Sequence, residues 1–281
     1  MTNASIRDTD LKRYEQLLRR AEKAPATVES YLRSARKFSA WLGSRKLDRQ
    51  AAADWKSELM SSGLAVATIN TRIAALNALV ESMGREECKI KPLRRQRRMF
   101  RDERRELTRR EYERLVEAAR SSRNERLVLV METICATGIR VSELQFITLE
   151  RVTDGIAEIS LKGKVRTILL PGRLRRKLLR YARAHGVTRG EVFRSKNGPG
   201  LSRKQIWAEM KALCRRAGVD AEKVYPHNLR HLFAREFYGE CRDVVKLADV
   251  LGHSSLETTR IYLMTTGAEH RAVLERMKLI S

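Results

Sequence analysis

The sequence of 281 residues is short of the residue types that define several protein classes. Its 4 cysteines include no Cys-x-x-Cys pair, so neither a zinc ribbon nor a redox dithiol is indicated. With only 5 prolines and 15 glycines, it is not a collagen-like or low-complexity chain. Aromatic residues make up 6%, which argues against a protein that binds single strands by stacking bases.

Long apolar runs are also missing. No stretch approaches the run of about 18 apolar residues that predicts a membrane span. Residues Met1 to Ser5 lack the basic-then-apolar layout of a signal peptide. We therefore expect no membrane association and a cytoplasmic location, in which the cysteines remain structural thiols.

Acidic residues are too few to balance the basic ones. Lys and Arg total 58 and Asp and Glu total 34, which gives a formal net charge of +24. A folded chain tolerates such self-repulsion when a polyanion neutralises it. Nucleic acid is therefore the first expected partner, and a membrane surface or an acidic protein are the alternatives.

The first 84 residues predict an all-helical domain, because their apolar residues recur at helical spacing. A basic linker follows at 85–106. Between Arg85 and Arg110 the chain has twelve Lys or Arg and five Asp or Glu, and Pro92 interrupts the run. Such a run is either a solvated connector or a strap that lies along DNA phosphates, and the charge of the whole chain favours the strap.

A second domain is expected at 107–281. Thr108 and Glu111 have the spacing of a capping box, and Leu127 to Ile139 is long enough for a buried helix. Residues 155–161 and 165–170 predict a β-hairpin. Further helices are predicted near 174–185, 203–216, 227–238, 242–250 and 256–264. The expected fold is therefore mainly α with a small antiparallel β-sheet, in two domains.

Polar residues of one chemical set lie within this second domain. Two arginines can present planar forks to the oxygens of one phosphate, and two histidines can donate to oxygen or transfer protons near neutral pH. A lysine at a hairpin tip can reach a leaving oxygen, and a tyrosine supplies an oxygen nucleophile. This set suffices for metal-free phosphodiester transfer through a phosphotyrosine; it comprises Arg140, His227, Arg230, His253, Tyr262 and a hairpin lysine.

These residues stand in motifs that resemble those of the tyrosine recombinases, also called the phage integrase family. The motifs are A-T-G-I-R-V-S-E-L at 136–144, H-N-L-R-H at 227–231 and L-G-H-S-S-L-E-T-T-R-I-Y at 251–262. The intervals also fit: His253 follows Arg230 by 23 residues and precedes Tyr262 by nine. The resemblance covers both domains.

The resemblance implies a role for each matching residue. Arg140 and Arg230 would hold the scissile phosphate and stabilise its transition-state charge. His227 would help to manage the proton of the nucleophile, and His253 would hydrogen-bond a phosphate oxygen. Tyr262 would attack, leaving a 3′-phosphotyrosine and a free 5′-hydroxyl. No metal, ATP or other cofactor is expected.

The hairpin lysine would protonate the departing 5′ oxygen. In the family the hairpin typically reads G-K-G-x-K-x-R, whereas here it is one residue shorter and Leu161 replaces the leading glycine. Lys162 is the favoured general acid and Lys164 is the alternative. Glu143 would support the pocket, and His231 would be a structural partner.

The resemblance further implies a compact, two-domain enzyme. Residues 1–84 would form the helical, SAM-like core-binding domain, and 107–281 the mixed α/β catalytic domain with its C-terminal tail. The partner would be double-stranded DNA. A homotetramer is expected on paired recombination sites, because two duplexes that are each cut twice need four nucleophiles. The apolar tail at 268–281 would pack either on its own domain or on a neighbouring protomer.

Two other functions are alternatives to site-specific recombination. One is a type IB topoisomerase-like enzyme, and the other is a non-catalytic DNA-binding protein. The two-domain layout and the short interval from His253 to Tyr262 favour the recombinase, as does the presence of every expected residue type. The short hairpin favours integration and excision of a mobile element, or inversion, over resolution of chromosome dimers. The target DNA sequence is not indicated.

Overall fold

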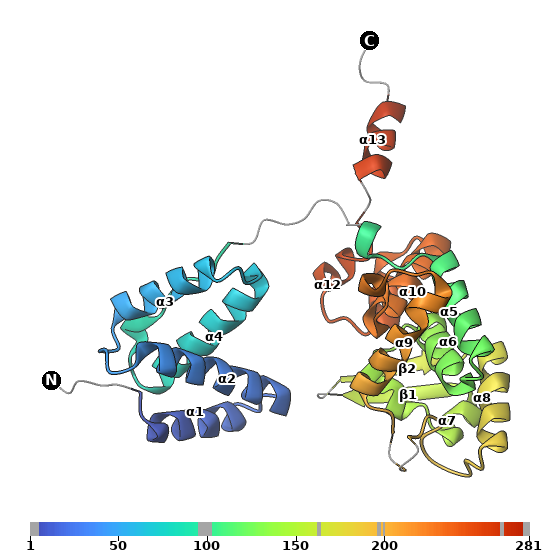
Figure 1. The fold of residues 1–281 in the computed structure, drawn as a ribbon, viewed down its shortest axis with the longest axis horizontal. Helices are drawn as coiled ribbons and strands as arrows, with labels where there is room; N and C mark the ends of the chain where they lie inside the picture. The colour runs from blue at the N-terminus through green and yellow to red at the C-terminus, as the bar shows by residue number, and fades with distance from the viewer. Residues whose placement is uncertain are drawn as a thin grey trace. The chain divides into compact units, whose positions relative to one another are not determined.

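The computed structural model describes residues 6–94, 103–161, 164–195, 198, 200–264 and 267–277. Figure 1 labels the helices and strands. The chain divides into two compact units, Met1–Arg97 and Arg98–Ser281, and each is described by itself.

The first unit is a helical bundle. Its helix α2 packs against α1 and α4, and α3 packs against α4 (Figure 1). The Phe38 and Trp55 rings meet at 4.9 Å in the core, and the Tyr14 hydroxyl donates to Ala75 O at 2.9 Å. The elements are α1 (Asp8–Arg20), α2 (Pro25–Leu42), α3 (Arg49–Ser61), α4 (Val66–Ser82) and the 3-10 helix η1 (Glu86–Cys88).

The segment after α4 is held to this bundle. The Asn77 side chain donates to Ile90 O at 2.9 Å and accepts from Ile90 N at 3.0 Å. Asn70 makes the same pair of bonds with Leu93, at 3.0 and 2.8 Å. Residues 85–94, expected as the start of the linker, therefore pack on α4 in this structure. Residues 95–102, the middle of the predicted strap, lie outside the described residues.

The second unit is built around α6, which packs against α5, α8, α9 and α10 (Figure 1). The predicted capping box is confirmed: Thr108 Oγ1 accepts from Glu111 N at 3.2 Å, and Thr108 N donates to Glu111 Oε2 at 2.8 Å. The helices are α5 (Arg109–Ser121), α6 (Glu125–Thr137), α7 (Leu149–Asp154), α8 (Gly172–Ala184), α9 (Arg203–Ala217), α10 (Pro226–Cys241), α11 (Val244–Leu251), α12 (Leu256–Arg260), α13 (Gly267–Arg276) and the 3-10 helices η2 (Glu103–Arg105), η3 (Val141–Phe146) and η4 (Ala221–Lys223).

The unit contains one antiparallel hairpin. Strand β1 (Ile156–Leu161) pairs with β2 (Lys164–Leu169) in a register that runs from Ile156 opposite Leu169 to Leu161 opposite Lys164. Ala157 and Ile159 are buried while Ile156, Glu158 and Ser160 are exposed, so one face of β1 meets the core. The prediction of a mainly helical fold with a small antiparallel sheet is confirmed.

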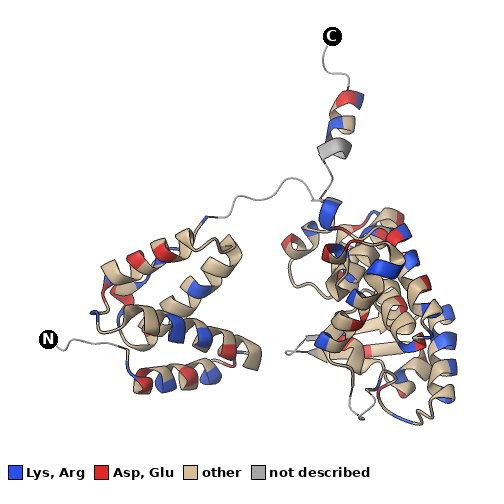
Figure 2. Cartoon of the chain, in the orientation of Figure 1, with Lys and Arg blue, Asp and Glu red and all other residues tan. Residues whose placement is uncertain are grey.

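Basic residues are spread over the helices of both units, with a run along α8 (Figure 2). The charge of +24 is therefore a property of both units rather than of one segment. Within the described ranges, no helix combines the length and the apolar character that a membrane crossing requires.

Candidate active site

The turn after α6 places Arg140. Gly138 ends the helix in the left-handed conformation (φ 64°), and a Cβ at this position would come within 2.4 Å of the Phe233 ring. Only glycine fits this turn without strain. Two residues later, Arg140 caps η3, and its side chain is 37% exposed.

A buried carboxylate holds Arg140. Glu143 Oε1 accepts from Arg140 Nη1 at 2.9 Å, and Glu143 Oε2 accepts from the Arg140 backbone N at 2.6 Å. The Glu143 side chain is only 2% exposed, and it also accepts from Arg166 on β2. The exposed guanidinium of Arg140 is therefore anchored from behind by its own turn.

The second arginine is buried on α10. Arg230 is 1% exposed; its Nη1 donates to Gly138 O at 2.5 Å and its Nη2 to Leu251 O at 2.7 Å. Burial lowers the pKa of Arg230 to about 10; the nearby charge of Arg140 adds to this, and Tyr262 opposes it. Arg230 is still a cation at neutral pH. Its Nε is buried without a hydrogen-bond partner among the described residues.

His253 contacts this arginine. Gly252 ends α11 in the left-handed conformation, and the next residue turns its ring so that Nε2 lies 3.0 Å from Arg230 Nη2. Because a guanidinium can only donate, Nε2 accepts and Nδ1 carries the proton, which it donates to Thr259 Oγ1 at 2.9 Å. Burial, together with the positive charges of Arg230 and Arg140, lowers the pKa of His253 to about 4. The ring is therefore neutral at pH 7.

Tyr262 lies against the two histidines next to Arg230. Its ring stacks on that of His253 at 5.7 Å and 11°, and the His231 ring lies 4.5 Å away. The helix predicted at 256–264 ends at Arg260 instead. From there the backbone forms tighter turns, in which Tyr262 N donates to Thr259 O at 3.0 Å. The Tyr262 side chain is 5% exposed.

His227 lies at the edge of the same cluster. It follows Pro226 in the first turn of α10, its side chain is exposed, and its ring meets that of His231 edge-on at 4.7 Å. The pKa of His227 is lowered, mainly by desolvation by the surrounding protein and further by the positive charges of Arg230 and Arg140. The neutral ring can accept a proton. The pKa of His231 is lowered to about 3, first by burial.

The structure thus brings together Arg140, His227, Arg230, His253 and Tyr262. Lys162 lies outside the described residues, and Lys164 is described only as the first residue of β2. Sequence reasoning missed the contacts of Thr259 and Arg166. Thr259 could have been noticed as a polar residue three positions before Tyr262, but its burial follows from packing.

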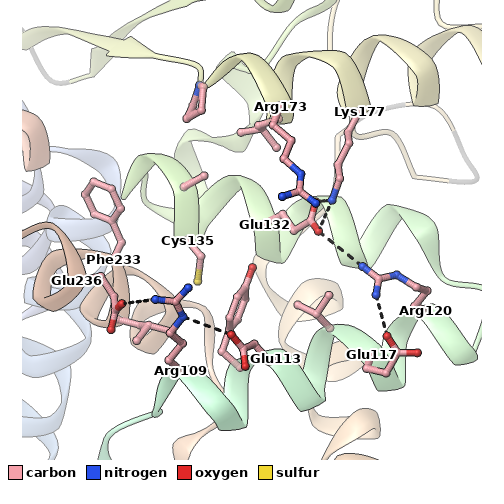
Figure 3. A pocket seen from close by; sticks show the side chains of 16 residues that line it. Arg109, Glu113, Glu117, Arg120, Glu132, Cys135, Arg173, Lys177, Phe233 and Glu236 are labelled. Atoms are coloured by element: carbon pink, nitrogen blue, oxygen red, sulfur yellow. Dashed lines mark hydrogen bonds and ion pairs between the residues drawn. The ribbon is translucent and has the colours of Figure 1, made fainter.

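The part of the chain that the structure describes contains no cluster of three His, Cys, Asp or Glu side chains arranged to hold a metal ion. A separate groove of about 860 Å³ opens between α5, α6, α8 and α10 (Figure 3). It is crossed by ion pairs, such as Lys177 with Glu132 at 2.6 Å and Arg109 with Glu236 at 3.3 Å. None of the candidate catalytic residues lines it.

Comparison with known proteins gives matches over both units. Residues 105–269 match the phage integrase family, and residues 11–87 match the phage integrase N-terminal SAM-like domain. Over 232 residues the chain is 30% identical to tyrosine recombinase XerA of Pyrococcus furiosus, covering 80% of this chain and 79% of the relative. It is 28% identical to tyrosine recombinase XerA of Thermococcus kodakarensis, covering 96% of this chain and 95% of the relative.

Solved structures share the fold. A XerH site-specific recombinase bound to a palindromic difH substrate superposes with a TM-score of 0.72 at 19% identity, over 99% of this chain and 91% of that chain. A lambda integrase tetramer bound to a Holliday junction superposes with a TM-score of 0.72 at 20% identity, over 91% of this chain and 76% of that chain.

Proposed function

Because the chain belongs to the phage integrase family of tyrosine recombinases, the enzymes that cut and rejoin DNA at specific sites, we propose that Tyr262 is its nucleophile. The observation that carries this proposal is the convergence of Tyr262, His253 and Arg230 in one cluster of side chains. The Tyr262 ring stacks on His253, and His253 accepts from Arg230. A buried cation beside a tyrosine suits the attack of a phenolic oxygen on a phosphate.

Cleavage then proceeds by exchange of one ester bond for another. Tyr262 Oη forms a bond to phosphorus as the bond to the 5′ oxygen breaks, which leaves a 3′-phosphotyrosine. The tyrosine proton passes to a neutral base, for which His227 is suited by its lowered pKa. The 5′ oxygen takes a proton from Lys162, with Lys164 as the alternative. Attack by the 5′-hydroxyl of another strand reverses these steps and rejoins the DNA.

The arginines supply the electrostatic stabilisation. Arg140 is a partly exposed cation, and the buried Arg230 Nε lacks a hydrogen-bond partner within the described chain. A phosphate bound at Arg140 would offset the repulsion between the two guanidiniums. His253 would join them by donating from Nε2 to a phosphate oxygen, which requires a proton on Nε2 in place of the bond that this atom accepts from Arg230. The reaction would need neither a metal ion nor ATP, because these groups supply the charge stabilisation that a metal would.

The two domains and the assembly complete the proposal. The helical domain at 1–84 would bind double-stranded DNA together with the catalytic domain at 107–281, and the linker at 85–106 would join them. Four protomers would act on two paired sites, as a tetramer of lambda integrase is bound to a Holliday junction. The wide distribution of basic residues suits such contacts with phosphates (Figure 2). Integration and excision of a mobile element, or inversion of a DNA segment, remains the favoured biological role.

Covalent capture from a library of nicked duplexes with randomised arms tests this function. The wild-type chain should form a denaturant-resistant adduct in excess EDTA without nucleotide, and the captured arms identify the site. Tyr262→Phe should bind that site and form no adduct, since it lacks only the attacking oxygen. Tyr238→Phe, on α10, is the matched control and should still be captured. An adduct with Tyr262→Phe, or a strict need for magnesium, would show the proposal to be wrong.

A further inference from the structure

Arg166 on β2 contacts two of the motif segments without belonging to the proposed set of catalytic residues. Its Nη2 donates to Glu143 Oε2 at 2.5 Å, and its Nη1 donates to Val250 O at 2.8 Å. The Arg166 side chain is 11% exposed. A Cβ added at Gly252 would come within 2.4 Å of Arg166 Cδ. Gly252 therefore makes room for Arg166 directly before His253.

The charges around Glu143 are unequal. One buried carboxylate accepts from two guanidiniums, those of Arg140 and Arg166, so the cluster keeps an excess of one positive charge. Without Arg166, Glu143 and Arg140 would form a neutral pair. The attraction of a buried carboxylate for its remaining cation would then compete with a phosphate for Arg140.

Arg166 also holds the end of α11. The carbonyls of Val250 and Leu251 are neighbours, and they accept from Arg166 and Arg230 respectively. Two guanidiniums thus fix the backbone that leads into His253. Burial lowers the pKa of Arg166, and Glu143 opposes this effect.

We propose that Arg166 is a positioning residue of the recombination reaction: by sharing Glu143 with Arg140, it leaves Arg140 a net positive charge for the scissile phosphate. This inference rests on the proposed function. Arg166 does not touch the phosphate itself, so its effect passes through the charge balance at Glu143.

The test compares two nicked substrates that carry the captured site and differ only at the scissile linkage. One has the ordinary phosphodiester. The other has a methylphosphonate, in which a methyl group replaces a non-bridging oxygen and removes the negative charge. Arg166→Gln should slow cleavage of the phosphodiester by about 10- to 100-fold, the usual cost of losing an outer partner of a charged site. Its effect on the neutral linkage should be several-fold smaller, and DNA binding should be retained.

Two further variants control the experiment. Arg166→Lys keeps the charge and should recover most of the phosphodiester cleavage. Arg126→Gln is the matched control, because Arg126 also pairs with a glutamate and a carbonyl, Glu209 at 2.8 Å and Arg194 O at 3.1 Å, and is 20% exposed. This variant should slow both linkages equally, if at all.

The outcomes separate this inference from the proposed function. If the wild-type chain cleaves neither linkage, the proposed function fails. If the wild-type chain cleaves but folded Arg166→Gln slows both linkages by the same factor, only the role of Arg166 is refuted. If Arg166→Gln does not fold, Arg166→Lys decides: near-wild-type rates on both linkages support the role, and an equal large loss on both overturns it.

Discussion

At the scale of single residues, the site depends on histidines that burial keeps neutral beside cations. The pKa of His253 falls from its ordinary 6.5 to about 4, and that of His231 to about 3. Each ring binds a proton more readily in the unfolded chain. The stability that they contribute is therefore complete above about pH 6.5 and is lost as the pH falls towards 4.

This linkage can be measured by urea unfolding between pH 7 and pH 4. We expect the free energy of unfolding to fall with pH in the wild-type chain, and to fall less steeply in His253→Asn, which removes one of the titrating rings. His185→Asn, at the end of α8, leaves both rings in place and should follow the wild type. An unchanged slope in His253→Asn would contradict the assignment.

At the scale of secondary-structure elements, the site is built from helix ends. The turn after α6 requires Gly138, whose Cβ position is occupied by the Phe233 ring at 2.4 Å. Gly218 ends α9 in the same left-handed conformation, with nothing within 4 Å of its Cβ position. Gly138→Ala should therefore lose more stability than Gly218→Ala.

The difference between these two variants isolates the steric clash. In both variants an alanine in the left-handed conformation costs about 1 kcal/mol of backbone strain. Only Gly138→Ala adds overpacking, which costs about 1–3 kcal/mol more. Urea unfolding of the two variants measures it, and cleavage by Gly138→Ala should also fall, because Arg140 follows the turn. Equal losses of stability would mean that the Phe233 ring moves aside freely.

The hairpin supplies the general acid in the proposed mechanism. Lys162→Ala should cleave an ordinary substrate slowly, and a 5′-bridging phosphorothioate should restore its rate, because a sulfur leaving group needs no proton. Lys164→Ala is the matched comparison and should show no such rescue. Rescue of Lys164→Ala alone would transfer the role to Lys164.

The helices and the hairpin were predictable from the sequence because their signals are local. Apolar periodicity, the Thr108 capping box and the motif spacings each lie within a few turns of chain. Arg166 and Thr259 could not be assigned in this way. The contact of Arg166 with Val250 joins residues 84 positions apart, and the bond from Thr259 to His253 depends on how α12 ends.

At the scale of the whole molecule, the C-terminal helix is the segment that we expect to take part in assembly. On α13 the side chains of Val273 and Leu274 are 44% and 55% exposed, and that of Met277, directly after the helix, is 51% exposed. Docking of this apolar tail on a neighbouring protomer would cover them and link the Tyr262 segment to assembly. Deletion of 268–281 should then retain binding to a single site and abolish synapsis and strand exchange, as followed by gel shift. If the truncated chain still forms normal synapses, docking on a neighbouring protomer is wrong and the tail acts only within its own protomer.

The hydrogen bonds from Asn70 to Leu93, and from Asn228 to Arg105 O at 2.8 Å, set the length of the tether between the two units. Leu93 and Arg105 are twelve positions apart, and this stretch of chain spans at most about 40 Å when fully extended. When one unit is bound to DNA, this short tether keeps the other unit close to the same DNA, at an effective concentration of roughly millimolar. If both units bind DNA as proposed, the affinity of the intact chain exceeds that of either half, and a single cut between the anchors should abolish this avidity without removing one DNA contact.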